Sequence, residues 1–334
     1  MKRTSLPLRR RDFITLIGGA AAWPLAVRAQ QPVMPMIGLL GSETPNWYTD
    51  RLRAFREGLA QTGYVEGRNV TIDYRWAEGR NDRLPSLAAE LVQQQVALIA
   101  TLGNTASALA AKAATSTIPI VFRIAADPVE VGLVASLSRP GGNLTGVTTL
   151  GVELGPKQLA LLHEVVPTAT VVALLVNPTN PALAETQSRV VPAAARTLGL
   201  SLPVLNASID RDFDAVFARL AQLRAGALVI GVDAFFNSHS AQLAALATRH
   251  AVPTISAYQE FTAAGGLMSY GGSIIAASHD AGVYAGRILN GEKPADLPVM
   301  QSTKVSLTIN LKTAKALGLE VPITLQAGAD EVIE

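Results

Sequence analysis

Strand-like and helix-like segments alternate along almost the whole chain, and this alternation is the feature that most limits its possible folds. Apolar runs bounded by Gly or Pro, such as residues 36–40, are typical of parallel strands that are covered on both faces. Amphipathic stretches such as residues 50–62 lie between them. Strict alternation predicts right-handed crossovers and a parallel sheet with helices on both faces.

The first run of alternation predicts one Rossmann-like lobe. Segment 70–76 alternates apolar and polar residues, as an edge strand does. The expected strands are residues 36–40, 70–76, 96–102, 118–122 and 144–148, and the expected helices are 50–62, 84–94, 105–115 and 129–137.

A break at RPGGNLTGVT (residues 139–148) separates this run from a second one. Pro140 and the Gly141–Gly142 pair end the preceding helix, and Gly151 allows a bend, which is typical of a hinge between lobes. The second run has expected helices at 153–166, 181–198, 212–224, 239–250 and 259–264, and expected strands at 171–176, 201–206, 227–231, 254–256 and 267–270.

Gly271–Gly272 predicts a second crossing between the lobes, and the last segments predict a third. Helix 274–289 returns to the first lobe, where Gly282 and Gly286 would allow a close approach to the sheet. Strand 304–309 and helix 311–317 return to the second lobe. We therefore predict an α/β fold of two Rossmann-like lobes with parallel sheets, joined by a three-crossing hinge. The N-terminal lobe comprises residues 30–149 and 272–300, and the C-terminal lobe comprises 150–271 and 301–334.

Residues 1–29 have the features of a cleavable signal peptide. Arg10 and Arg11 form a twin-arginine pattern, a short apolar run follows, and Val27–Arg28–Ala29 offers a cleavage site, so export by the Tat or the Sec route is expected. A retained amphipathic anchor is the alternative. The run is too short to span a bilayer, and we expect a mature protein that is periplasmic and not inserted in the membrane.

Charge and cysteine content exclude several classes of function. Loss of residues 1–29, which hold six basic residues and one acidic residue, changes the formal net charge from +2 to −3. A mature chain of this charge has no drive to bind nucleic acid. The absence of cysteine excludes disulfides, thiolate metal sites and a lipidated cysteine.

Candidate ligand-binding residues follow the carboxyl ends of the predicted strands, where parallel sheets bind ligands. If the two sheets face each other with these ends, the loops enclose a cleft. Aromatic residues form only 5% of the chain yet cluster in these loops. The candidates are Ser42, Glu43, Trp47, Asn104, Thr105, Asp127, Asn177, Asn180, Asp233, Phe235, Tyr258 and Tyr270.

Each candidate also has a purely structural interpretation. Asn104, Asp127 and Asn180 are good N-caps, and Gly103–Asn104–Thr105 suits a carboxylate because caps and anion sites use the same N–H groups. Asp233 suits a ligand amino group or is a solvated loop charge. Phe235 and its neighbour Phe236 either face the ligand or pack against the adjacent loop.

Catalytic and cofactor motifs are missing from the sequence. The four histidines have no zinc-ligand spacing, LMSYG (267–271) matches a nucleophile elbow only in part, and neither a P-loop nor a strand followed by G-x-G-x-x-G is present. We therefore expect no catalytic residue, no metal site and no cofactor.

Six segments together resemble the ABC transporter substrate-binding proteins of the tryptophan/tyrosine-uptake type. They are RRDFI (10–14), GYVEG (63–67), YRWAEG (74–79), RPGGNLTGVT (139–148), AAGGLMSYG (263–271) and NLKTAKALGL (310–319). The resemblance implies a type I periplasmic binding fold with a small solute held between the lobes, and we expect a monomer. The solute would be an aromatic amino acid or a related carboxylate, delivered to the transmembrane subunits of an ABC permease. A sensory protein that presents its bound state to a membrane receptor, and a periplasmic enzyme on the same scaffold, are the alternatives.

Overall fold

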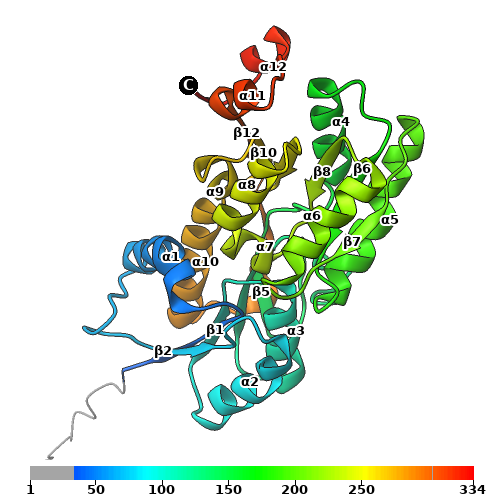
Figure 1. Ribbon diagram of the computed structural model, residues 1–334. Coiled ribbons are helices and arrows are strands. Elements are labelled where there is room, and N and C mark those ends of the chain that lie inside the picture. Colours follow the sequence, from blue (N-terminus) through cyan, green and yellow to red (C-terminus); the bar gives the residue numbers. More distant parts are fainter. Residues whose placement is uncertain (1–33, 303) are drawn as a thin grey trace, which may run out of the picture. The chain divides into compact units, whose positions relative to one another are not determined.

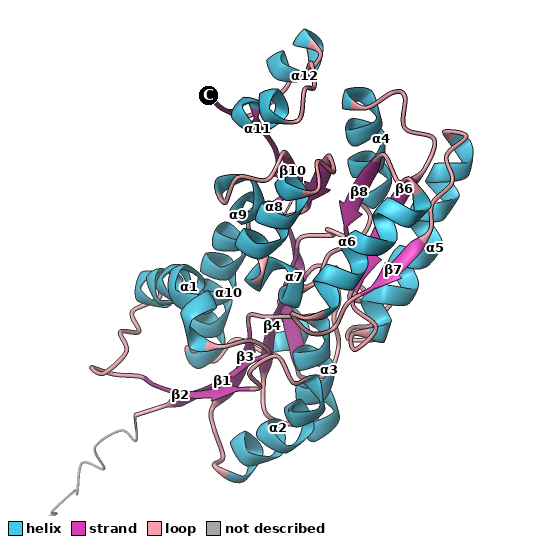
Figure 2. Ribbon diagram, viewed as in Figure 1, coloured by secondary structure: helices cyan, strands magenta, loops and turns pink. Residues whose placement is uncertain are grey.

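The computed structural model describes residues 34–302 and 304–334, and residues Pro35–Glu334 form one compact unit (Figure 1). The predicted signal peptide lies outside the described residues. Two separate sheets, each with helices on both faces, define an α/β fold (Figure 2). The sequence prediction of this fold class is confirmed.

The first sheet has six strands in the order β11-β5-β4-β3-β1-β2, and all of its pairs are parallel. The strand β2 is at the edge, as its alternating pattern predicted. The strands are β1 (Met36–Gly41), β2 (Thr71–Trp76), β3 (Leu98–Thr101), β4 (Ile120–Ile124), β5 (Leu144–Thr148) and β11 (Met300–Gln301). With its helices α1 (Thr49–Gln61), α2 (Leu84–Gln93), α3 (Thr105–Ala114) and α10 (Ile274–Leu289), this sheet is called the first lobe.

The second sheet has seven strands in the order β13-β12-β10-β9-β8-β6-β7. Its strands are β6 (Val172–Val176), β7 (Val204–Asn206), β8 (Ala227–Ile230), β9 (Thr254–Ser256), β10 (Met268–Gly272), β12 (Val305–Asn310) and β13 (Glu331–Ile333). With α4 (Gly155–Val165), α5 (Pro181–Thr197), α6 (Asp212–Leu223), α7 (Ala234–Ser238), α8 (Ser240–Arg249), α9 (Gln259–Ala263), α11 (Leu311–Ala316) and α12 (Ile323–Ala327), it is called the second lobe.

The chain crosses between the lobes after β5, between β10 and α10, and between β11 and β12. One feature of the second sheet departs from the prediction: β12 runs antiparallel to β10. The chain enters the second sheet from the side of the first lobe, so β12 begins beside the end of β10, where Val305 pairs with Gly272.

The predicted helix at 129–137 is wrong. The Asp127 side chain accepts hydrogen bonds from the backbone N–H groups of Val129 and Glu130, which begins a turn. Gly132 then has a φ of 69°, a left-handed conformation that a helix interior does not contain. Leu133 and Val134 are nevertheless buried in the first lobe. The apolar residues of this segment therefore predicted its burial correctly, but their spacing wrongly predicted a helix.

The helices α1 and α10 lie side by side on the first sheet (Figure 1). A Cβ atom on Gly282 would lie 2.0 Å from the Phe55 carbonyl oxygen, and one on Gly58 would lie 2.0 Å from that of His279. The glycine pair at 282 and 286 therefore allows close packing against α1 and not against the sheet, which corrects the prediction.

Two apolar clusters form each lobe's core. In the first lobe Leu91 and Phe122 represent the cluster on one face of the sheet and Phe55 the cluster on the other. In the second lobe, Leu162 belongs to the cluster on one face of the sheet and Phe217 to the cluster on the other. No helix of the described residues is long and apolar enough to cross a membrane.

Candidate functional site

The loops at the carboxyl ends of the strands of both sheets meet in the same region. Asn81, in the loop after β2, donates from Nδ2 to the Thr179 carbonyl oxygen at 3.2 Å, and Thr179 follows β6 of the second sheet. Glu130 of the first lobe pairs with Arg189 of α5. The carboxyl ends of the two sheets therefore face each other, as the candidate cleft requires.

At the centre of this interface Asp233, after β8, is held by two asparagines that follow β6. Its Oδ1 accepts from Asn177 Nδ2 at 2.9 Å and from the Phe235 backbone N–H at 3.0 Å, and its Oδ2 accepts from Asn180 Nδ2 at 2.8 Å. Burial raises the pKa of this carboxyl group, and the three hydrogen bonds oppose the rise. Asn180 thus binds a carboxylate and does not cap α5.

Glu43 brings a second buried carboxyl group to this interface from the first lobe. Its exposure is 6%, and burial, followed by the charge of Asp233 on the opposite lobe, raises its pKa to about 7. The charge of Arg51 and hydrogen bonds with Ser42 and Ser238 act in the opposite direction. Burial and the neighbouring charge of Asp233 thus favour the protonated form of Glu43 where the two lobes meet.

Two buried arginines of the first lobe lie near each other at this interface. Arg123 of β4 donates from Nη2 to the carbonyl oxygens of Leu102 at 2.6 Å and Gly103 at 2.9 Å. Burial and the nearby charge of Arg51 lower its pKa to about 10. Arg51, in the first turn of α1, lies over the Tyr48 ring, 5.2 Å from its centroid.

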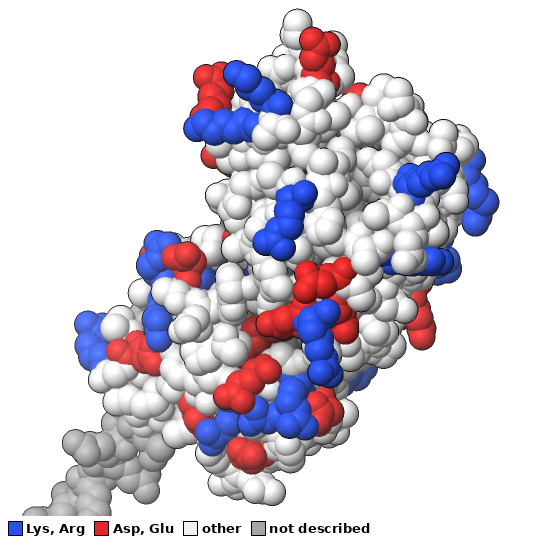
Figure 3. Space-filling model, in the orientation of Figure 1, with Lys and Arg blue, Asp and Glu red and all other residues white. Residues whose placement is uncertain are grey.

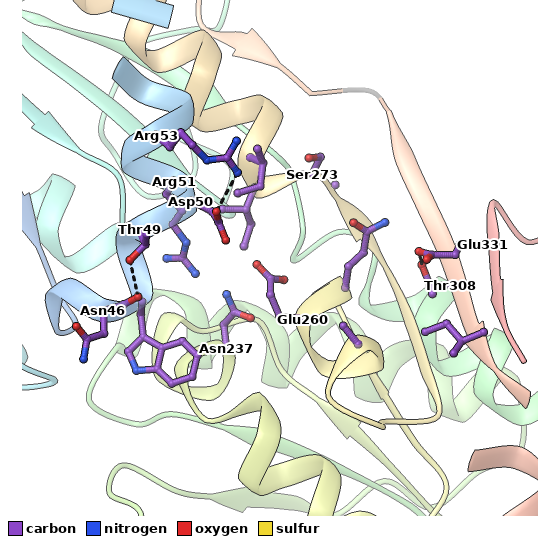
Figure 4. A pocket seen from close by; sticks show the side chains of 17 residues that line it. Asn46, Thr49, Asp50, Arg51, Arg53, Asn237, Glu260, Ser273, Thr308 and Glu331 are labelled. Atoms are coloured by element: carbon purple, nitrogen blue, oxygen red, sulfur yellow. Dashed lines mark hydrogen bonds and ion pairs between the residues drawn. The ribbon is translucent and has the colours of Figure 1, made fainter. Parts of the chain in front are cut away.

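A cavity of about 560 Å³ opens beside this centre and is lined by both lobes. Its size is in the range of small-molecule sites. The side chains of Arg51, Asn237 and Glu260 point into it (Figure 4). The first lobe contributes Trp47, Asp50, Arg51, Arg53, Ser273, Ile274 and Ile275, and the second contributes Asn237, Gln259, Glu260, Ala263 and Thr308.

A second cavity of about 300 Å³ also has Trp47 in its lining. Its lining includes Glu43 and Glu78 from the first lobe and Phe235 and Asp210 from the second. Figure 3 shows acidic side chains gathered in the middle of this face, below α6 and α7, with Lys and Arg side chains beside them. The Trp47 side chain, which is 45% exposed, is thus shared by the two cavities.

Three other sequence candidates lie at the first lobe's rim and are buried. Asn104 accepts from the Ser107 backbone N–H at 2.8 Å and forms a capping box, so its predicted capping role is confirmed. It also donates to Asn81 at 3.4 Å. Thr105 begins α3, and Ser42 Oγ lies 3.5 Å from the Tyr48 hydroxyl.

The remaining aromatic and acidic candidates divide between the interface and the cores. Tyr258 is buried in the cluster that joins Ala125 and Val152 to Val232 across the interface. Phe235, like its neighbour Phe236, packs in the second lobe's core, where its ring stacks on Phe213 at 5.4 Å between centroids. Asp127 caps its own turn, and Tyr270 packs against the outer core of the second lobe, so the structure does not bring these two together with the others.

Sequence reasoning missed Arg51 and Glu260. A signal for Arg51 existed, because it lies four residues before the buried Phe55, on the stripe of α1 that faces the protein. Glu260 lies two residues after Tyr258, in the first turn of α9, where the helix dipole by itself favours an acidic residue. Nothing in the sequence distinguishes it from an ordinary surface charge.

The chain matches the ABC transporter substrate binding protein family over residues 47–333, and it belongs to that family. A tyrosine-binding protein from Clostridioides difficile is 27% identical over 269 residues, which is 80% of this chain and 76% of the relative.

Solved structures show the same fold. A conserved domain protein from Vibrio cholerae has a TM-score of 0.82 at 25% identity, covering 90% of this chain and 99% of the other. With the same coverage, a Streptococcus pneumoniae ABC domain in complex with L-Trp has a TM-score of 0.78 at 24% identity. The ligand-free, open form of a substrate-binding protein with adhesive properties from Clostridium difficile has a TM-score of 0.63 at 26% identity and that coverage.

Proposed function

We propose that this chain is the solute-binding component of an ABC importer. It captures an aromatic amino acid or a related carboxylate between its lobes in the periplasm and delivers it to the transmembrane subunits of a permease. Residues 1–29 direct export by the Tat or the Sec route, and the mature protein acts as a monomer without catalysis.

The observation that carries this proposal is the cavity of about 560 Å³, because both lobes line it and Trp47 offers an aromatic face to its occupant. A ligand that contacts both lobes stabilises the closed arrangement by the difference between its affinities for the closed and open states. The three crossings after β5, after β10 and after β11 then serve as the hinge.

The names of similar proteins support the choice of solute. One relative is a tyrosine-binding protein, and one structural neighbour is a complex with L-Trp. An aromatic amino acid combines a planar apolar ring with two charged groups, and the cavity offers Trp47, Ile274 and Ile275 beside Arg51 and Glu260.

Calorimetric titration and thermal unfolding with L-tyrosine, L-tryptophan, L-leucine and L-glutamate test the proposal. We expect binding of at least one aromatic amino acid and a rise in melting temperature that grows with ligand concentration. The corresponding gain in unfolding free energy is about 2.7 kcal/mol at 100 times Kd. Mass spectrometry of the solute that co-purifies with the exported protein gives an independent answer. Binding of none of these amino acids, with no solute retained, would overturn the proposal.

A further inference from the structure

We propose that Arg51 and Glu260 read the two charged ends of an α-amino acid, with the carboxylate on Arg51 and the ammonium group on Glu260. This inference rests on the proposed function, and it deepens that function by assigning specificity to two residues. It also predicts which chemical groups a solute needs in order to bind.

The first observation is the state of the Arg51 guanidinium group. The residue is only 4% exposed, yet within residues 34–302 and 304–334 it makes no hydrogen bond and no ion pair. A buried charge without a partner is costly, so an anion that enters the cavity gains a partner already in place. The planar fork of arginine matches a carboxylate with two parallel hydrogen bonds.

The neighbouring charges favour an anion at Arg51. Arg123 adds a second buried positive charge, and its Nε and Nη2 groups donate to the carbonyl oxygens of Leu102 and Gly103. Glu43 acts on Arg51 only through space and forms no ion pair with it among the described residues. Burial and the charge of Asp233 favour the neutral form of Glu43, which weakens it as a competitor for Arg51.

The second observation is that Glu260 faces the same cavity from the other lobe. Figure 4 shows the Arg51 and Glu260 side chains directed into one space. Glu260 is exposed to solvent, and within the described part of the chain its carboxylate forms no ion pair with Arg51 and no hydrogen bond with another side chain. A zwitterion between them gives the buried Arg51 guanidinium group an anion, replaces water at the exposed Glu260 carboxylate, and links the first lobe to the second.

Arg53 lines the same cavity but, unlike Arg51, already forms ion pairs. It lies two residues along α1, and its side chain is 64% exposed. It is paired with Asp50 at 2.9 Å and with Glu57 at 3.7 Å. Because its charge is already paired and solvated, Arg53 does not need the ligand carboxylate as Arg51 does. The control variant is placed at Arg56, which lies on the same helix, pairs with Glu66 and does not line the cavity.

The test compares three probes, L-tyrosine, tyrosinamide and desamino-tyrosine, by calorimetric titration. Tyrosinamide lacks the carboxylate, and desamino-tyrosine lacks the ammonium group. We expect the unmodified protein to prefer tyrosine to each analogue by about 10- to 100-fold, the worth of a charged hydrogen-bonded contact. R51M should lose the preference over tyrosinamide, and E260Q should lose the preference over desamino-tyrosine while keeping the other.

Two further variants separate recognition from folding. R51K keeps the charge and loses the fork, so it should show an intermediate preference over tyrosinamide. R56M should leave both preferences within about twofold, since Arg56 pairs with Glu66 and does not line the cavity. This inference is overturned, while the proposed function stands, if R51M keeps the full preference for tyrosine over tyrosinamide. It is likewise overturned if E260Q keeps the full preference for tyrosine over desamino-tyrosine. Failure of the unmodified protein to bind any aromatic amino acid overturns the proposed function itself.

Discussion

The Asn177 side chain donates a hydrogen bond of 2.9 Å to the Asp233 carboxylate, and this contact fixes two neighbouring loops of the second lobe to each other. Asn180 completes the arrangement at 2.8 Å from the other carboxylate oxygen. Both oxygens of Asp233 therefore already have donors from the protein. Its direct contact with a ligand amino group stays a prediction, and its demonstrated role is to shape the rim.

Replacement of Asp233 tests how much this network stabilises the lobe. Asp233→Ala removes three hydrogen bonds and leaves two buried carboxamides without an acceptor, so we expect a loss of about 3 kcal/mol of unfolding free energy. Asp233→Asn should cost less, because the Asn180 carboxamide can rotate and present its oxygen to the new amide. Urea unfolding of the three proteins measures the order. An alanine variant as stable as the unmodified protein would contradict this account.

Glu43 gives the protein a pH dependence of defined sign. Burial, followed by the charge of Asp233, raises the pKa of Glu43 to about 7 from 4.5, so the folded protein binds this proton more tightly than the unfolded chain. Stability from this group is therefore full below pH 4.5 and is lost as the pH rises through 7. The total loss is about 3 kcal/mol at most.

Glu43→Gln isolates this contribution from the other titrating groups. The raised pKa of Asp233 adds a dependence of the same sign, and the lowered pKa of Asp212 adds the opposite one, but both are present in the two proteins. We expect the variant to match the unmodified protein near pH 4.5 and to exceed it in stability at pH 8. Parallel stability curves for the two proteins across this pH range would rule out a buried, proton-linked Glu43.

Gly282→Ala probes the contact between α1 and α10. Alanine favours a helix over glycine by about 1 kcal/mol, but the new methyl group would lie 2.0 Å from the Phe55 carbonyl oxygen, which belongs to a backbone that cannot move alone. We expect a net loss of about 1–3 kcal/mol in unfolding free energy. Gly151→Ala is the control, because its nearest neighbours would lie at 3.5 and 3.6 Å and its stability should change little. Equal stability of both variants would contradict the close helix contact.

The sequence predicted most elements because their periodicity is local. Apolar strands and amphipathic helices follow from residue spacing, and the helix at Ile274–Leu289 was placed with its observed bounds. The errors arose where a single backbone conformation or a long-range pairing decides the outcome. Gly132 turns the chain out of a helix, and the direction of β12 depends on its pairing with β10.

The candidate site was predictable as a set of loops but not as a network. The strand ends located Glu43, Trp47, Asn177 and Asp233, since topology places such residues at one edge of a sheet. Which donor meets which acceptor depends on tertiary contacts, so the hydrogen bond between Asn180 and Asp233 replaced the expected cap. Arg51 was missed because a charged residue near a helix start is usually solvated.

Trp47 makes ligand binding visible by fluorescence. Its ring is 45% exposed and lines both interlobe cavities, whereas Trp76 packs 4.7 Å from the Tyr48 ring and lines neither. Tyrosine in the larger cavity should remove water from Trp47 and shift its emission to shorter wavelength, since the probe itself does not emit in that range. Trp47→Phe should abolish the shift and weaken tyrosine binding by about tenfold, the worth of one aromatic contact. Trp76→Phe should retain the shift. If the shift were lost in Trp76→Phe and kept in Trp47→Phe, the ligand would lie away from Trp47.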